Sequence, residues 1–193
     1  MAATPETKRV VTIPNFLSLI RILLIPLFVV LLFDEDTRLG AMFLLGGLQA
    51  TDWVDGWVAR RFGQVSSLGK VLDPFADRLL VASALVSFVW LEAFPLWAAL
   101  LILVRDAAIL LAGAALMVLG RPQLEVRRLG KIATFTLMWG GPLIAWGNFG
   151  FLLDDAALVL GWIWFLVGVI EYYAATVLYV GDFRRVLAAG KPA

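Results

Sequence analysis

Six long stretches of mostly apolar residues constrain this chain more than any other feature. A helix that spans a bilayer needs about 20 such residues, and its backbone polar groups must all be satisfied within the helix. Hydrophobic residues make up 62% of the 193-residue chain, whereas soluble proteins average roughly 45–50%. The sequence therefore predicts an all-α, polytopic membrane protein with six transmembrane helices. The expected spans cover residues 15–33, 39–60, 68–91, 96–119, 129–146 and 156–180.

The polar ends of the chain are expected to flank a single membrane domain. Residues 1–12 form the expected N-terminal tail, 13–181 the six-helix domain, and 182–193 the C-terminal tail. Twelve Lys and Arg residues lie in the tails, in two of the connecting segments or at the span ends beside those segments, whereas the segments on the opposite side hold only Arg38. By the positive-inside rule, this asymmetry places both termini in the cytoplasm.

Four carboxylates lie inside the second and third expected spans: Asp52, Asp55, Asp73 and Asp77. An ionisable group at membrane depth costs a few kcal/mol or more unless it is paired, hydrated or bound to a cation. On a helix, the first two share one face and the last two share another. If these helices face each other, they gather an oxygen-only site of the kind that hard divalent cations prefer. The chain has no His and no Cys, which excludes the usual zinc and thiolate chemistry.

Small residues and one cation recur at set intervals around these carboxylates. The pattern Asp-x2-Asp-Gly-x2-Ala-Arg-x8-Gly-x3-Asp-x3-Asp is completed by Gly56, Ala59, Arg60 and Gly69. Ordinary interhelical ion pairs, such as Asp55 with Arg60 or Asp77 with Arg105, would need no small residues at set intervals. The full pattern resembles the signature of the CDP-alcohol phosphotransferases, membrane enzymes that make phospholipids from a CDP-linked donor.

This resemblance implies a role for each signature residue. The expected ligands of two Mg²⁺ or Mn²⁺ ions are Asp52, Asp55, Asp73 and Asp77. Asp77 is also expected to accept the proton of the attacking hydroxyl as a general base. The small residues are expected to lie against the cytidine of the donor, and Arg60 to place positive charge near its phosphates. The expected donor-binding residues are Gly56, Ala59, Arg60, Gly69, Asn15 and Ser18.

Polar residues also recur at i, i+3 and i+6 on the first span, as Asn15, Ser18 and Arg21. They resemble the family's Pro-Asn-x2-Ser/Thr-x2-Arg opening, which faces the active site. Arg21 is therefore expected to bind the acceptor. Further candidates for binding an acceptor phosphate are Arg105, Arg128 and Lys131. The positive-inside rule is an alternative explanation for basic residues at span ends.

The resemblance is to the bacterial branch of the family that uses CDP-diacylglycerol and releases CMP. Glycerol 3-phosphate is the first expected acceptor, as in a phosphatidylglycerophosphate synthase. Phosphatidylglycerol, as in a cardiolipin synthase, is the second, and inositol phosphate is the third. One departure bears on this order: typical synthases carry Arg-Glu and then Gly-Leu-Arg in the fourth span, whereas this chain has Arg105-Asp106 and no second Arg there.

Two non-enzymatic hypotheses compete with this reading. A cation or proton transporter would usually show inverted repeats or broken helices near the midplane, and no repeat is visible. An inactive scaffold would be expected to have lost a ligand of the signature, which is complete. The expected partners are CDP-diacylglycerol, a small alcohol phosphate or lipid acceptor, membrane lipids and, as in the family, a second copy of the chain. No nucleic-acid motif is present, and the expected location is a bacterial inner membrane with the site facing the cytoplasm.

Overall fold

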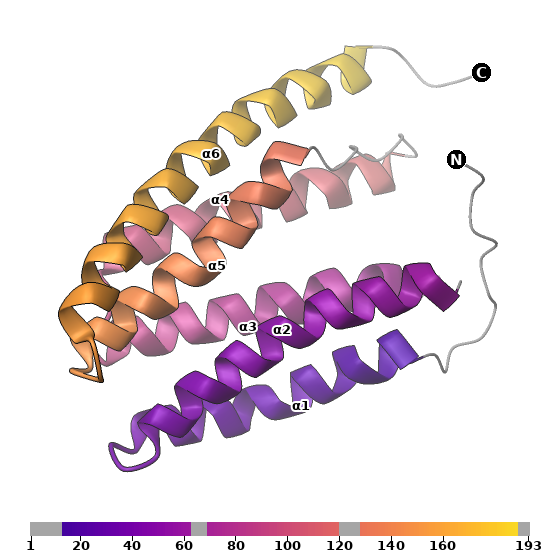
Figure 1. Ribbon diagram of the computed structural model, residues 1–193. Coiled ribbons are helices and arrows are strands. Elements are labelled where there is room, and N and C mark those ends of the chain that lie inside the picture. Colours follow the sequence, from indigo (N-terminus) through magenta and orange to yellow (C-terminus); the bar gives the residue numbers. More distant parts are fainter. Residues whose placement is uncertain (1–12, 63–68, 120–127, 189–193) are drawn as a thin grey trace. The chain divides into compact units, whose positions relative to one another are not determined.

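The described part of the chain is helical. The computed structural model describes residues 13–62, 69–119 and 128–188, and these residues form six helices and no strand (Figure 1). The helices are α1 (Ile13–Phe33), α2 (Arg38–Phe62), α3 (Gly69–Trp90), α4 (Leu96–Val118), α5 (Arg128–Asn148) and α6 (Asp154–Ala188). The prediction of an all-α fold is confirmed for these residues.

The helices belong to two compact units. The first unit, Met1–Leu91, contains α1, α2 and α3, and the second unit, Glu92–Ala193, contains α4, α5 and α6. In the first unit α1 packs against both α2 and α3, and in the second unit α5 packs along α6. The sequence predicts one domain over residues 13–181, and this boundary stays a prediction.

One face of α1 is buried along the length of the helix. Its buried residues recur every three or four positions: Asn15, Ser18, Arg21, Ile25, Phe28 and Leu32. This spacing places them on a single stripe. Positions between them, such as Leu23 and Val30, are apolar and exposed, as expected where a helix faces lipid. The stripe is polar near the start of α1 and apolar after Arg21, so the polar part belongs to one end of the first unit.

Two side chains satisfy the carbonyl groups at the other end of α1. The Thr37 hydroxyl donates to the Leu31 carbonyl at 2.8 Å, and Arg38 Nε donates to the Leu32 carbonyl at 3.1 Å. Carbonyl groups in the last turn of a helix have no intrahelical donor. The Thr37 and Arg38 side chains supply donors to two of these carbonyl groups. A short turn can therefore join α1 to α2 (Figure 1).

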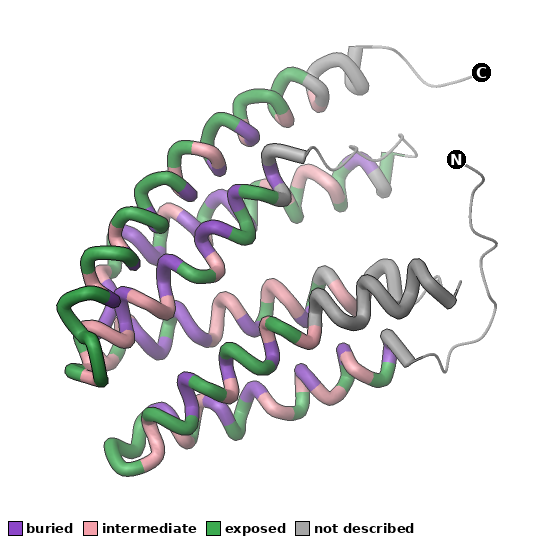
Figure 2. The backbone as a smooth tube through the Cα atoms, in the orientation of Figure 1, coloured by how far each residue is buried: buried purple, intermediate pink, exposed green. Residues whose placement is uncertain are grey.

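In the second unit, α5 and α6 approach each other so closely that glycine is required at the contact. A Cβ atom at Gly140 would lie 2.8 Å from the backbone nitrogen of Phe165, and one at Gly161 would lie 2.7 Å from that of Ile144. Figure 2 shows most of α6 exposed, with buried positions at intervals. These buried positions form one stripe: Ala157, Gly161, Phe165, Gly168, Tyr172 and Ala175.

Three segments of the described helices are long and apolar enough to cross a membrane. They are Asn15–Phe33, Leu96–Leu116 and Asp154–Gly181. The other three helices are less apolar: α2 and α3 carry the signature carboxylates with several basic residues, and α5 contains Gly, Thr and Trp among its apolar residues. Six spans with both termini in the cytoplasm therefore stay a prediction.

The helix bounds agree with the expected spans to within two residues at every end except the last. Helix α6 continues to Ala188, whereas the sixth expected span ends at residue 180. The extension contains Arg184 and Arg185, which are good helix formers. A transmembrane span ends where the apolar residues end, whereas a helix can continue through charged residues that favour it.

Candidate active site

The polar part of the α1 stripe is tightly enclosed. Ser18 is 0% exposed, Arg21 1% and Asn15 6%. A buried guanidinium in an apolar helix is costly unless a partner compensates its charge. The first unit must therefore supply a carboxylate close to Arg21.

Two carboxylates of α3 contact this stripe. Asp73 and Asp77 are four residues apart, so they share a face of α3 one turn apart. The Ser18 hydroxyl donates to Asp73 Oδ1, and Arg21 Nη1 forms an ion pair with Asp77 Oδ1. The Arg21 side chain is 1% exposed, whereas that of Asp77 is 39% exposed. Asp77 thus joins the interior of the first unit to a surface that another molecule can reach.

The remaining signature residues lie on α2 and at the start of α3. Five belong to α2 and one is the first residue of α3: Asp52, Asp55, Gly56, Ala59, Arg60 and Gly69. Their side chains lie outside the described part of the structure. The packing of α1 against both α2 and α3 is compatible with a shared site, and the gathering of four carboxylates stays a prediction.

The carboxylates of α3 suit a divalent cation chemically. Carboxylate oxygens are the ligands that Mg²⁺ prefers, and they also suit Mn²⁺. Asp73 and Asp77 are both only partly buried, and they lie one turn apart. Among the described side chains, no three Asp, Glu, His or Cys residues gather into a metal-binding group. Asp52 and Asp55 are not among those side chains, so the residues present still fit a cation site formed by all four.

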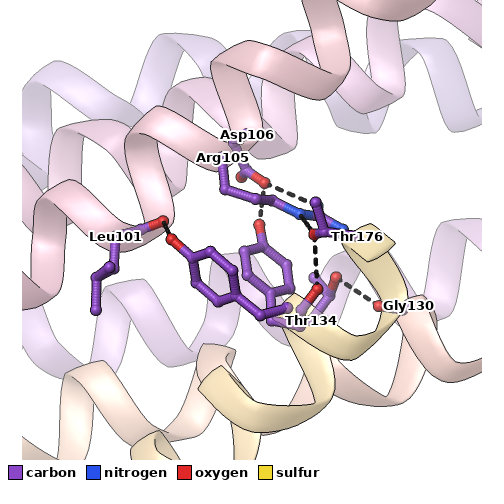
Figure 3. Close-up of polar contacts among 8 residues, drawn as sticks. Leu101, Arg105, Asp106, Gly130, Thr134 and Thr176 are labelled. Atoms are coloured by element: carbon purple, nitrogen blue, oxygen red, sulfur yellow. Dashed lines mark hydrogen bonds and ion pairs between the residues drawn. The ribbon is translucent and has the colours of Figure 1, made fainter. Parts of the chain in front are cut away.

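A second polar cluster lies inside the second unit, between α4 and α6 (Figure 3). We call it the Arg105 cluster; it consists of Arg105 and Asp106 from α4 and Tyr172 and Thr176 from α6. Arg105 Nη1 lies 3.2 Å from Asp106 Oδ1, and Arg105 Nε donates to Thr176 Oγ1 at 2.8 Å. The guanidinium carbon lies 3.8 Å from the centre of the Tyr172 ring, and the Tyr172 hydroxyl donates to Asp106 Oδ1.

The Arg105 cluster compensates the charge of a buried guanidinium. Arg105 is 6% exposed and Asp106 is 7% exposed, so both depend on partners rather than on water. The sequence predicts Arg105 as an acceptor ligand but does not identify Tyr172 and Thr176 as its partners. These two residues form a polar pair at i and i+4 on α6, and this spacing is a signal that could have pointed to them.

The basic start of α5 approaches the same part of α6. A Cβ atom at Gly130 would lie 3.1 Å from the Tyr179 hydroxyl, and the Tyr179 ring centre lies 5.9 Å from the Arg105 guanidinium carbon. Tyr179 therefore lies near both Arg105 and the first turn of α5. Arg128 and Lys131 belong to that turn, but their side chains lie outside the described part of the structure. Their role as acceptor ligands stays a prediction.

The chain matches a known family over most of its length. Residues 11–176 match the family described as CDP-alcohol phosphatidyltransferase. Over 189 residues the chain is 40% identical to a Streptomyces coelicolor protein named cardiolipin synthase (CMP-forming), and the match covers 95% of this chain and 88% of that protein.

Two further relatives carry a different name, CDP-diacylglycerol–glycerol-3-phosphate 3-phosphatidyltransferase. The Bacillus subtilis protein is 36% identical over 138 residues, which cover 64% of this chain and 70% of the relative. The Rickettsia typhi protein is 31% identical over 170 residues, which cover 84% of this chain and 93% of the relative. The family match includes the whole signature region, residues 52–77.

Proposed function

Because the chain belongs to the CDP-alcohol phosphatidyltransferase family, we propose that it transfers a phosphatidyl group from CDP-diacylglycerol to a hydroxyl of phosphatidylglycerol. The products are CMP and cardiolipin. The observation that carries the proposal is the pair of α3 carboxylates, Asp73 and Asp77, held from α1 at a partly exposed position. Their place in the complete family signature supports a catalytic role.

The proposed reaction forms one phosphorus–oxygen bond and breaks another. The acceptor hydroxyl oxygen attacks the phosphorus of the phosphatidyl group, and CMP leaves with the bridging oxygen. We assign Asp77 as the group that accepts the hydroxyl proton, and the partial exposure of its carboxylate supports this role. Asp52, Asp55 and Asp73 would hold, together with Asp77, the divalent cations on which this family generally depends. When bound, such cations neutralise the charge that develops on the diphosphate.

We assign the donor nucleotide to the small residues of α2 and α3. Gly56, Ala59 and Gly69 leave room for cytidine to approach the helix backbones, and Arg60 places positive charge near the phosphates. Asn15 is buried on the same α1 stripe as Ser18. Its amide can donate to and accept from a polar group of the donor.

The Arg105 cluster supports phosphatidylglycerol as the acceptor. Asp106 already compensates the charge of Arg105, and Thr176 and Tyr172 occupy further positions around the guanidinium. A phosphate monoester with two negative charges gains less from a compensated cation than from an open one. The relative that matches 95% of this chain is named a cardiolipin synthase, which supports the same acceptor.

Glycerol 3-phosphate is the second candidate acceptor. The names of the Bacillus subtilis and Rickettsia typhi relatives favour it, as does the ranking drawn from the sequence. Arg128 and Lys131, on the first turn of α5, would then supply the charge that a phosphate monoester requires.

We also propose that the site faces the cytoplasm of a bacterial inner membrane, with both chain ends on that side, and that two copies pair as a homodimer. Three apolar helices and the basic residues near the chain ends support the membrane arrangement. The chain has no cysteine, so single cysteines can report the topology. A cysteine at Lys191 should react with an impermeant thiol reagent only from the cytoplasmic side, and one at Asp155 only from the other side. The reverse pattern would overturn the orientation.

The acceptor is tested with the purified chain in detergent micelles. CDP-diacylglycerol and Mg²⁺ or Mn²⁺ are supplied with phosphatidylglycerol, glycerol 3-phosphate or inositol phosphate in separate reactions, and both CMP and the lipid product are measured. We expect cardiolipin to form with phosphatidylglycerol. Product with glycerol 3-phosphate alone would support the second candidate, and a folded chain that releases no CMP with any acceptor would contradict both.

A further inference from the structure

We propose that Ser18 and Arg21 are positioning residues that hold the α3 carboxylates in place, rather than ligands of the donor or the acceptor. Arg21 in particular is a built-in counter-ion for Asp77. The inference rests on the proposed function, because it concerns the carboxylate that acts on the acceptor. It differs from the roles that the family resemblance implies, which assign Ser18 to the donor and Arg21 to the acceptor.

The spacing of the two contacts supports this role. Ser18 and Arg21 are three residues apart on α1, and their partners Asp73 and Asp77 are four residues apart on α3. With a rise of about 1.5 Å per residue, each pair advances by roughly one helical turn. Two adjacent contacts of this kind fix both the height and the rotation of α3 against α1. A single contact would leave the rotation of the carboxylate face undetermined.

Burial separates the two members of each contact. Ser18 is 0% exposed and Arg21 is 1% exposed, whereas the Asp77 side chain is 39% exposed. A molecule can therefore reach the Asp77 carboxylate, whereas the Arg21 guanidinium is enclosed. Arg21 acts on the reaction through Asp77.

The charges around Asp77 also support a positioning role for Arg21. Asp73 and Asp77 lie one turn apart on α3, and the signature adds two more carboxylates on α2. Like charges this close disfavour the folded site when no cation is bound. Arg21 contributes one positive charge beside them. Because the guanidinium is planar and carries several donors, it can orient a carboxylate as well as compensate it.

The test replaces Arg21 with Gln and with Lys and measures four quantities: the melting temperature with a chelator and with Mg²⁺, the affinity for Mn²⁺, kcat, and the KM for the acceptor. We expect Arg21→Gln to melt at a lower temperature than the wild type in chelator and to regain more of the loss when Mg²⁺ is added. Its kcat should fall by about 10-fold or more, with the acceptor KM changed by less than about 3-fold. Arg21→Lys restores the positive charge but lacks the planar guanidinium. Relative to Arg21→Gln, its melting temperature should therefore recover more than its kcat.

Arg38→Gln is the matched control, because Arg38, the first residue of α2, contacts the Leu32 carbonyl at the far end of α1. It should leave the Mg²⁺ dependence of melting unchanged. Ser18→Ala provides a second test if Arg21→Gln does not fold: loss of the hydroxyl that orients Asp73 should weaken Mn²⁺ binding by about 10–100-fold.

A raised acceptor KM with unchanged kcat and unchanged melting in Arg21→Gln would overturn the inference, because Arg21 would then bind the acceptor. Unchanged Mn²⁺ affinity in Ser18→Ala would overturn the role of Ser18. The melting and Mn²⁺ measurements do not require turnover. They therefore test the inference even if the wild type releases no CMP, a result that would count against the proposed function alone.

Discussion

Two buried arginines of this chain each pair with a carboxylate from the same unit. Arg21 pairs with Asp77 in the first unit, and Arg105 pairs with Asp106 in the second. An uncompensated charge in such surroundings would cost several kcal/mol, so each pair contributes to the stability of its unit. Replacing one member of a pair should therefore strongly destabilise the unit that contains it.

Tyr172→Phe tests this reasoning in the Arg105 cluster. The substitution removes the hydroxyl that donates to Asp106 but keeps the ring beside the Arg105 guanidinium. We expect the free energy of unfolding to fall by about 1–3 kcal/mol, because a buried carboxylate loses a donor. The measurement is the melting temperature of the purified protein in detergent.

The neighbouring tyrosine provides the control for that variant. Tyr173 is 38% exposed and donates to the Leu101 carbonyl at 3.1 Å. Tyr173→Phe removes the same hydroxyl from a position that solvent or lipid head groups can reach, so its melting temperature should fall less. Equal losses in the two variants would contradict the importance of the Tyr172 contact.

Part of this residue-scale description could be predicted from the sequence. The i, i+3, i+6 spacing correctly places Asn15, Ser18 and Arg21 on one face of α1. The spacing cannot tell which carboxylate each residue contacts, because that depends on how α3 is rotated about its axis. For the same reason the sequence shows Asp106 beside Arg105 but does not reveal that Tyr172 and Thr176 complete the cluster.

At the scale of the elements, α5 and α6 are held together by close packing of their backbones. Gly161 of α6 faces Ile144 of α5, and Gly140 of α5 faces Phe165 of α6. Small residues at such contacts let helices approach closely, and close approach is a main source of stability between helices in lipid. The second unit therefore depends on these positions being glycine.

Gly161→Ala should push α5 and α6 apart. The added Cβ atom would lie 2.7 Å from the backbone nitrogen of Ile144, which cannot move without its helix. We expect a loss of about 1–3 kcal/mol in the free energy of unfolding, as for other overpacked sites. The melting temperature in detergent measures it.

Gly113→Ala is the control for the glycine variant, because a Cβ atom there has no neighbour within 4 Å. Alanine is the better helix former, so this variant should be as stable as the wild type or up to about 1 kcal/mol more stable. If Gly161→Ala is as stable as Gly113→Ala, then α5 and α6 do not pack at the distance described.

Helix bounds were the most predictable property of the elements. Runs of apolar residues interrupted by short polar turns locate helix ends directly, which explains the agreement at all ends except that of α6. The contacts between helices were less predictable. All faces of these helices are rich in apolar residues, so hydrophobicity alone does not show which face packs against a neighbour.

At the scale of the whole molecule, the signature carries the functional conclusion. The signature lies inside residues 11–176, which match the CDP-alcohol phosphatidyltransferase family, and the relatives are named as a CMP-forming synthase and as a transferase that uses CDP-diacylglycerol. The acceptor was less predictable, because it depends on a few charges such as those of Arg105, Arg128 and Lys131. Whether these charges are open or compensated depends on tertiary contacts, as the Arg105 cluster demonstrates.

The most direct test measures the release of CMP from CDP-diacylglycerol by the wild type and by Asp77→Asn. Phosphatidylglycerol is the acceptor, and each protein is assayed with Mg²⁺ or Mn²⁺ and with a chelator. Asp34→Asn, in the exposed turn after α1, is the control, because the amide keeps an oxygen that can accept from the Asp36 backbone nitrogen. We predict metal-dependent CMP release by the wild type and the control, and a loss of at least about 100-fold in Asp77→Asn, which should still bind the donor. Full activity in Asp77→Asn would contradict the assignment of Asp77 as the base.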